Sequence, residues 1–360
     1  MTTQEPFYKK STTILFGLIL VVYVLFMLSD ILVPLAFAGL LAVLLNPLYN
    51  RLMNLKVPKV LSISIALLVA FLIVAAILYF LSSQIMQFGE MLPTLKTKFN
   101  QILTDLQRWI ASSFGISFEK QLQYFKEAAN SNKALISRTL SGALGVFSIL
   151  FLLPVYIFLL LFYKTLILNF IYEVFSKEGP DSVAGVLKET KAAIQSYIVG
   201  LLIEAFIVAI LNSAALLLLG VDYAILIGVI GAILNLIPYI GGLVAILLPV
   251  LMATVTKDGY TTQLLILGAY AIIQFIDNNI LVPRIVSSKV QINALISILA
   301  VLLGGALWGV SGMFLSIPFV AVLKIVFDKI EGLKPWGKLL GDEVPSVNFT
   351  QRWKLRRRRV

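Results

Sequence analysis

The sequence contains no cysteine and no histidine, and only 13% of its 360 residues are charged. Without cysteine the chain can form no disulfide, no thiolate metal site and no thiol nucleophile. Without histidine it lacks the commonest general base and the commonest metal ligand. The sequence also has no Walker P-loop and no Gly-x-Ser-x-Gly elbow. These absences predict that the chain is not an enzyme and carries no metal or other cofactor. The one enzymatic alternative is a carboxylate pair made by Glu204 and Asp277.

Apolar residues are the majority, at 59% of the chain, and the mean hydropathy is +0.96. A soluble domain is about 45–50% apolar and about 25% charged, so the excess requires a lipid environment. The sequence therefore predicts an all-α polytopic integral membrane protein. A full span needs about 20 apolar residues. About six runs reach that length: Thr12–Ser29, Ile31–Tyr49, Val60–Leu81, Leu140–Tyr163, Ile198–Gly220 and Thr262–Pro283.

Basic residues predict the orientation in the membrane. They cluster at Lys9–Lys10, at Arg51–Lys59 and in the tail from Lys324 to Val360, which holds ten basic and four acidic residues of a chain with net charge +11. Because cytoplasmic loops are enriched in Lys and Arg, both termini are expected in the cytoplasm. The basic tail (328–360) is then expected to lie on anionic lipid headgroups rather than to bind nucleic acid.

Two polar segments read as amphipathic helices. The first, 82–139, lies outside the cytoplasm by alternation, and its apolar residues are spaced by three and four: Leu92, Leu95, Phe99, Ile102, Leu106 and Trp109. It is expected either to pack on its own domain or the membrane interface, or to contact another subunit. The second, Asp181–Tyr197, follows Pro180 and is expected to lie along the cytoplasmic surface, coupling span four to span five. The chain thus divides into 1–81 (three spans), 82–139, 140–197, a transport core (198–327) and the tail.

The transport core contains two interrupted apolar segments. Tyr223–Ile237 and Leu243–Thr256 are too short to span comfortably, and a proline and two glycines separate them. The same pattern recurs where a glycine-rich break divides Gln291–Leu303 from Met313–Phe327. We expect two re-entrant hairpins in an inverted arrangement, a pattern that marks transporter binding sites; the alternative is a set of ordinary spans. The expected tips contain Pro238, Tyr239, Gly241, Gly242, Gly304, Gly305, Gly309 and Gly312.

Polar residues within apolar runs of this core are the candidate site, because such residues usually face a cavity. They are Glu204, Asn212, Asn235, Gln274, Asp277 and Asn278. Carboxylate and amide oxygens suit Na⁺, Li⁺ or a hydroxyl-rich solute. Two alternatives are structural: Glu204 could reach the cytoplasmic interface, and Asp277 could pair with Arg284, one residue after Pro283, where the helix is expected to break.

The C-terminal half resembles the AI-2E family, the autoinducer-2 exporter family of transporters. The resemblance is carried by Asn235–Gly241, by Asp277–Pro283, by the Gly304–Gly312 break and by Ser316–Pro318, and it extends over nearly the whole chain. It implies a homo-oligomer in a bacterial inner membrane that exports a small polar molecule such as autoinducer-2. Members of the family often carry a His-Pro pair where Asn293-Ala294 stands here, so a role of that histidine cannot be transferred.

The expected function is therefore secondary transport of a small polar solute. The resemblance also implies Na⁺(Li⁺)/H⁺ antiport as an alternative, and a passive channel or facilitator is a second alternative. If transport is coupled to protons, Glu204 or Asp277 must carry them, because the chain has no histidine.

Overall fold

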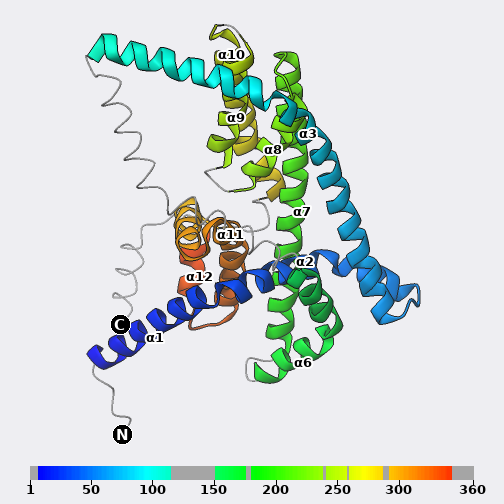
Figure 1. Ribbon diagram of the computed structural model, residues 1–360. Helices are drawn as coiled ribbons and strands as arrows, with labels where there is room; N and C mark the ends of the chain where they lie inside the picture. Colours follow the sequence, from blue (N-terminus) through cyan, green and yellow to red (C-terminus); the bar gives the residue numbers. More distant parts are fainter. Residues whose placement is uncertain are drawn as a thin grey trace.

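The computed structural model describes residues 7–114, 151–175, 180–237, 241–257, 259–286 and 292–342. Within these ranges the regular structure is helical, apart from one antiparallel bridge between Ile292 and Gly341. Figure 1 shows the arrangement of the helices. They are α1 (Phe7–Met27), α2 (Ser29–Asn54), α3 (Lys59–Phe114), a helix at Phe151–Phe162, α6 (Lys164–Val174), α7 (Pro180–Leu218), α8 (Ala224–Asn235), α9 (Gly241–Thr256), α10 (Thr261–Ile276), η2 (Asp277–Val286), α11 (Ala294–Lys329) and α12 (Lys334–Leu340).

Five helices of the described residues are long and apolar enough to cross a membrane, or up to six if the bent pair at Phe151–Val174 is one span. The five include α11, although its backbone is broken at Trp308 and Gly309, and they do not include the apolar helix Ser11–Met27, which is shorter. Many large apolar side chains on them are exposed, as lipid-facing residues of a membrane protein are. The predicted all-α polytopic fold is confirmed. Residues 140–150 of the expected fourth span lie outside the described residues.

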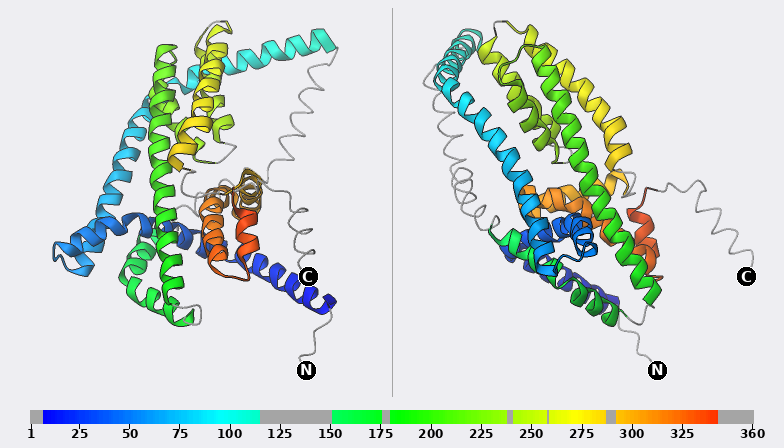
Figure 2. Two further views of the ribbon diagram at one scale, coloured as in Figure 1. Left: turned by 180° about the vertical axis from the view of Figure 1, so that it is seen from behind. Right: turned by 90° about the vertical axis from the view of Figure 1, so that its right-hand side faces the viewer.

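Helix α3 joins the third span to the polar segment that follows it. It is 56 residues long and continues through Pro93. Figures 1 and 2 show its first part running along the bundle and its last part, drawn in cyan, extending from the bundle as an arm. The expected amphipathic helix is therefore the continuation of a span. Residues 115–139 of the predicted polar segment lie outside the described residues.

Helix α7 differs from the expectation of a surface helix followed by a span. Residues 181–197 and span five form one 39-residue helix, Pro180–Leu218. The polarity of the side chains changes near Tyr197, but no proline or glycine pair interrupts the backbone there, so the helix continues. Figure 2 shows α7 running the length of the bundle.

Both interrupted segments fold back on themselves. Helices α8 and α9 pack against each other, and a Cβ on Gly241 would collide with the backbone of Leu234. In α11 the chain leaves helical geometry at Trp308 and at Gly309, whose φ is 60°. Eight residues of straight helix span about 12 Å, yet a Cβ on Gly304 would collide with the carbonyl of Gly312. The chain therefore reverses at the break, whereas re-entry of these hairpins into the membrane stays a prediction.

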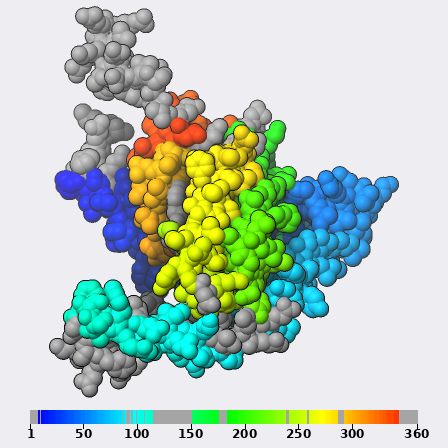
Figure 3. All heavy atoms as spheres, turned by 90° about the horizontal axis from the view of Figure 1, so that it is seen from above, coloured from blue at the N-terminus to red at the C-terminus, as the bar shows by residue number. Residues whose placement is uncertain are grey.

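The buried apolar residues form three clusters. One joins α7 to α8, α9 and α10, a second joins α2, α3 and the helix at Phe151–Phe162, and a third joins α7 to α11. Figure 3 shows α7, α10 and α11 side by side at the centre, while α1 and the start of α3 project from it. Helix α7 thus belongs to two of the three clusters and connects the C-terminal helices to one another.

Candidate functional site

Three helices bring two buried carboxylates to one amide. Glu204 lies on α7, Asn235 is the last residue of α8, and Asp277 lies at the junction of α10 and η2. The Nδ2 of Asn235 donates to Asp277 Oδ2 at 2.9 Å and to Glu204 Oε1 at 3.4 Å. Glu204 is 4% exposed and Asp277 is 2% exposed. Glu204 and Asp277 are 31 and 42 positions from Asn235 in the sequence, yet their side chains meet its amide in the interior.

Gln274 extends this cluster toward the first hairpin. Its Nε2 lies 3.5 Å from both Asp277 Oδ2 and Asn278 Oδ1, which is at the limit of hydrogen bonding. A Cβ on Gly242 would collide with the Gln274 carboxamide. The glycine therefore lets the polar side chain lie against the start of α9. Asn278 is exposed, so it forms the outer edge of the cluster.

The two carboxylates have no basic partner among the described residues. No Lys or Arg nitrogen of that part of the chain lies within 4.0 Å of either one. Asp277 Oδ1 is buried and accepts no hydrogen bond there. Burying unpaired charge is costly, so these carboxylates require a proton, a cation or the polar groups of a solute.

The alternative that Asp277 pairs with Arg284 is not what the structure shows. Arg284 is exposed, and no ion pair joins it to the buried Asp277. The helix also does not end at Pro283, because the wider π-helical winding of η2 carries it from Asp277 to Val286. This winding changes which side chains share a face. Such segments are frequent at functional sites, and Pro283 still leaves one carbonyl without a helical donor.

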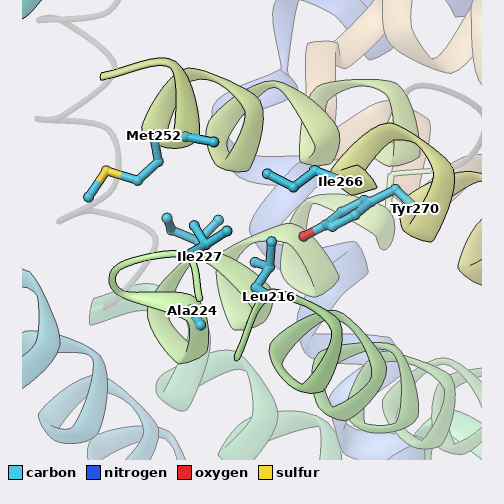
Figure 4. Packing of buried hydrophobic residues seen from close by; sticks show 8 residues of the cluster. Leu216, Ala224, Ile227, Met252, Ile266 and Tyr270 are labelled. Carbon is cyan, nitrogen blue, oxygen red and sulfur yellow. The ribbon is translucent and has the colours of Figure 1, made fainter. Parts of the chain in front are cut away.

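Asn212 lies apart from the carboxylates, two turns further along α7. It is 2% exposed, and its Oδ1 has no hydrogen-bond partner among the described residues. The position of a Cβ on Gly231 is 3.3 Å from Asn212 Nδ2 and 3.7 Å from the hydroxyl of Tyr270. That buried hydroxyl also has no hydrogen-bond partner in the described part of the chain, and Figure 4 shows it directed into the apolar cluster. The same three helices thus hold a second polar layer. Sequence reasoning missed Tyr270, although it lies seven residues before Asp277, on the same side of α10.

The expected hairpin tips are divided between described and undescribed residues. Pro238 and Tyr239 lie outside the described part. Gly241 and Gly242 begin α9 in close contact with Leu234 and Gln274. The remaining four glycines lie within α11: Gly304, Gly305, Gly309 and Gly312. The second hairpin does not contribute a side chain to the hydrogen bonds of the carboxylate cluster in the described residues.

Asn293 has a structural role. Its Oδ1 caps the start of α11 by accepting from the N–H of Ile296 at 3.0 Å. Its Nδ2 donates to the carbonyls of Leu339 and Gly341 at the end of α12. The side chain therefore ties the first arm of the second hairpin to the C-terminal helix.

Comparison with known proteins gives one consistent assignment. The family described as AI-2E family transporter matches residues 14–332. AI-2 transport protein TqsA of Escherichia coli is 27% identical over 317 residues, which cover 87% of this chain and 90% of that protein. Putative transport protein YrrI of Bacillus subtilis is 25% identical, over 86% of this chain and 92% of its own. Putative transport protein MT0215 of Mycobacterium tuberculosis is 27% identical, over 94% of this chain and 93% of its own length.

The match extends from the first apolar helix through the carboxylate cluster to the end of the second hairpin. The apolar helices and the lipid-facing side chains agree with it. The chain is an integral membrane protein that belongs to the AI-2E family of transporters.

Proposed function

We propose that this chain is a secondary transporter that exports a small polar molecule such as AI-2, and that Glu204, Asn235 and Asp277 bind it. The observation that carries the proposal is the pair of buried carboxylates joined by one amide with no basic partner in the described part of the chain. A polar solute can donate hydroxyl groups to these oxygens. The substrate named for the relative TqsA supports the choice of AI-2.

A second candidate is Na⁺(Li⁺)/H⁺ antiport. The oxygen atoms favour it, because carboxylate and amide oxygens are suitable ligands for a small hard cation. Asp277 Oδ1 and Asn212 Oδ1 are buried acceptors without a donor among the described residues. A passive channel or facilitator is the second alternative, and no feature of the buried cluster favours it over the other two.

The position of the first hairpin favours a transport mechanism in which this hairpin moves relative to the carboxylates. Asn235 ends the first arm of the first hairpin, and Gly242 begins the second arm against Gln274. A displacement of this hairpin would therefore move Asn235 away from Glu204 and Asp277. We infer that the amide exchanges its two carboxylate acceptors for groups of the solute. Both termini are expected in the cytoplasm, because basic residues cluster near them.

Purified protein in liposomes tests the proposal directly. Vesicles loaded with AI-2 should release it faster than protein-free vesicles, and an imposed pH or Na⁺ gradient should change the rate. Movement of Na⁺ against protons in the absence of AI-2 identifies the antiporter instead. Release that is saturable but indifferent to both gradients identifies a facilitator. Release equal to that of protein-free vesicles, with no ion movement, refutes transport of either cargo by this chain.

A further inference from the structure

The buried side-chain oxygens that have no hydrogen-bond partner lie along one pair of helices. In the described part of the chain these atoms belong to Thr190, Asn212, Gln263, Tyr270 and Asp277. The first two residues lie on α7, the next two lie on α10, and the last follows α10 directly. Buried polar groups in proteins nearly always have partners, so these oxygens are free to bind a polar ligand or water. Together they mark a polar route through an otherwise apolar core.

The route extends from the carboxylate cluster toward the start of α10. On α7, Asn212 is eight residues after Glu204, and on α10, Tyr270 is seven residues before Asp277. Each step is about two turns, or about 10–12 Å along a helix. Asn212 and Tyr270 both lie against Gly231, so the two helices run antiparallel and both steps lead the same way. These two residues thus form the next polar layer beyond the carboxylates.

A glycine of α8 leaves space beside this layer. The position of a Cβ on Gly231 is 3.3 Å from Asn212 Nδ2 and 3.7 Å from the hydroxyl of Tyr270. Both polar groups therefore face the same small volume, yet no hydrogen bond joins the two in the described structure. Figure 4 shows the Tyr270 hydroxyl directed from α10 toward Leu216 of α7. Asn212 Oδ1 can accept a hydrogen bond and the Tyr270 O–H can donate one, so a single hydroxyl group satisfies both.

We propose that Asn212, Tyr270 and Gly231 form a second binding site, which takes a neutral hydroxyl group. The hydroxyl donates to Asn212 Oδ1 and accepts from the Tyr270 O–H, and it has room because Gly231 has no side chain. Neither partner carries a charge at neutral pH, so the site favours a neutral group over an unpaired ion. The hydroxyl belongs either to the polar cargo, as it moves between the carboxylate cluster and the start of α10, or to water. The cargo source rests on the proposed function, whereas the site itself does not.

Two substitutions of Gly231 test whether the site exists. Gly231→Ala fills the space with a methyl group and leaves both polar groups without a partner, whereas Gly231→Ser brings in a hydroxyl of its own. On helix propensity alone alanine is the more stabilising residue. The site predicts the reverse order, with a higher midpoint of thermal unfolding for Gly231→Ser than for Gly231→Ala in the full-length protein in detergent. Gly268 is the matched control, because a Cβ there has no atom within 4 Å; at that position alanine should be at least as stabilising as serine.

Transport of AI-2 in proteoliposomes identifies the source of the hydroxyl. If the cargo supplies it, Tyr270→Phe should raise the half-saturating concentration of AI-2 about tenfold, which corresponds to the loss of one buried hydrogen bond, with little change in the maximal rate. If water supplies it, Tyr270→Phe should leave that concentration unchanged while the order of the two Gly231 variants holds. Tyr260→Phe is the matched control, because Tyr260 is 80% exposed just before α10, and it should transport like the wild type.

The proposal is overturned if Gly231→Ala unfolds at the same temperature as Gly231→Ser or at a higher one, because the space would then take a methyl group as readily as a hydroxyl. Tyr270→Phe gives a second test if the Gly231 variants cannot be purified. It should lower the midpoint, whereas removal of an unpartnered buried hydroxyl would raise it and overturn the proposal. Neither comparison needs transport, so absence of AI-2 transport by the wild type would refute the proposed function alone.

Discussion

Replacing Gly312 by Ala tests the reversal of α11. A Cβ at this position would collide with the carbonyl oxygen of Gly304 and lie 3.0 Å from Trp308 Cβ. Backbone atoms cannot move aside as the end of a flexible side chain can. Overpacking of this kind costs about 1–3 kcal/mol. Gly304→Ala should have a similar effect, because its Cβ would collide with the carbonyl of Gly312.

If α11 were a straight helix, the same substitutions would raise the free energy of unfolding instead of lowering it. If α11 were one uninterrupted span, its 36 residues would extend about 54 Å and the two glycines would be about 12 Å apart. Alanine would then stabilise the helix by about 0.8–1.0 kcal/mol. Gly268→Ala in α10 is the matched control, because a Cβ there would have no atom within 4 Å. It should be neutral or stabilising.

The measurement is the free energy of unfolding of each variant in detergent, followed by tryptophan fluorescence. We expect Gly304→Ala and Gly312→Ala to be less stable than the wild type, and Gly268→Ala to be at least as stable. If all three variants are equally stable, the two arms do not pack against each other. The chain reversal at Trp308–Gly309 would then be refuted.

Three further predictions follow from the site and the orientation. Asn235→Leu should lower the free energy of unfolding by about 1.5–3 kcal/mol, because a buried carboxylate loses its 2.9 Å hydrogen bond; unchanged stability would mean that the amide does not bridge the acids. Asp277→Asn should reduce transport, and adding Arg284→Gln should not restore it, because the arginine is exposed and unpaired with Asp277; recovery of flux in the double variant would restore the ion-pair interpretation. A single cysteine at Ser112, an exposed position of α3 in this cysteine-free chain, should react with an impermeant maleimide in intact cells; labelling only after permeabilisation would reverse the orientation.

Hydropathy and glycine or proline positions predicted most of the spans and both interrupted segments. They did not predict how far the helices continue. The change from apolar to polar residues after Leu81 and before Ile198 marks the edge of the lipid, but the backbone stays helical across it. Solvent preference and helix continuity are separate properties, and only the first can be inferred from hydropathy.

The residues of the proposed site were singled out from the sequence, but their contacts were not predicted. Glu204, Asn235 and Asp277 were singled out because each is polar within an apolar run. Their meeting depends on the packing of α7, α8 and α10, which a single sequence does not specify. The alternative pairing of Asp277 with Arg284 assumed α-helical turns, and the π-helical winding of η2 changes that spacing. Tyr270 was overlooked because an aromatic residue in a span gives no polar signal.

The initial rate of AI-2 transport in proteoliposomes tests the central claim most directly when the buried acids are compared with an exposed one. Glu204→Gln and Asp277→Asn remove the charges of the buried pair, whereas Asp222→Asn changes an exposed acid at the start of the first hairpin. We predict that both buried-acid variants insert normally and lose most of the transport rate, while Asp222→Asn transports like the wild type. If Glu204→Gln and Asp277→Asn transport AI-2 at the wild-type rate, the buried carboxylates are not the binding site.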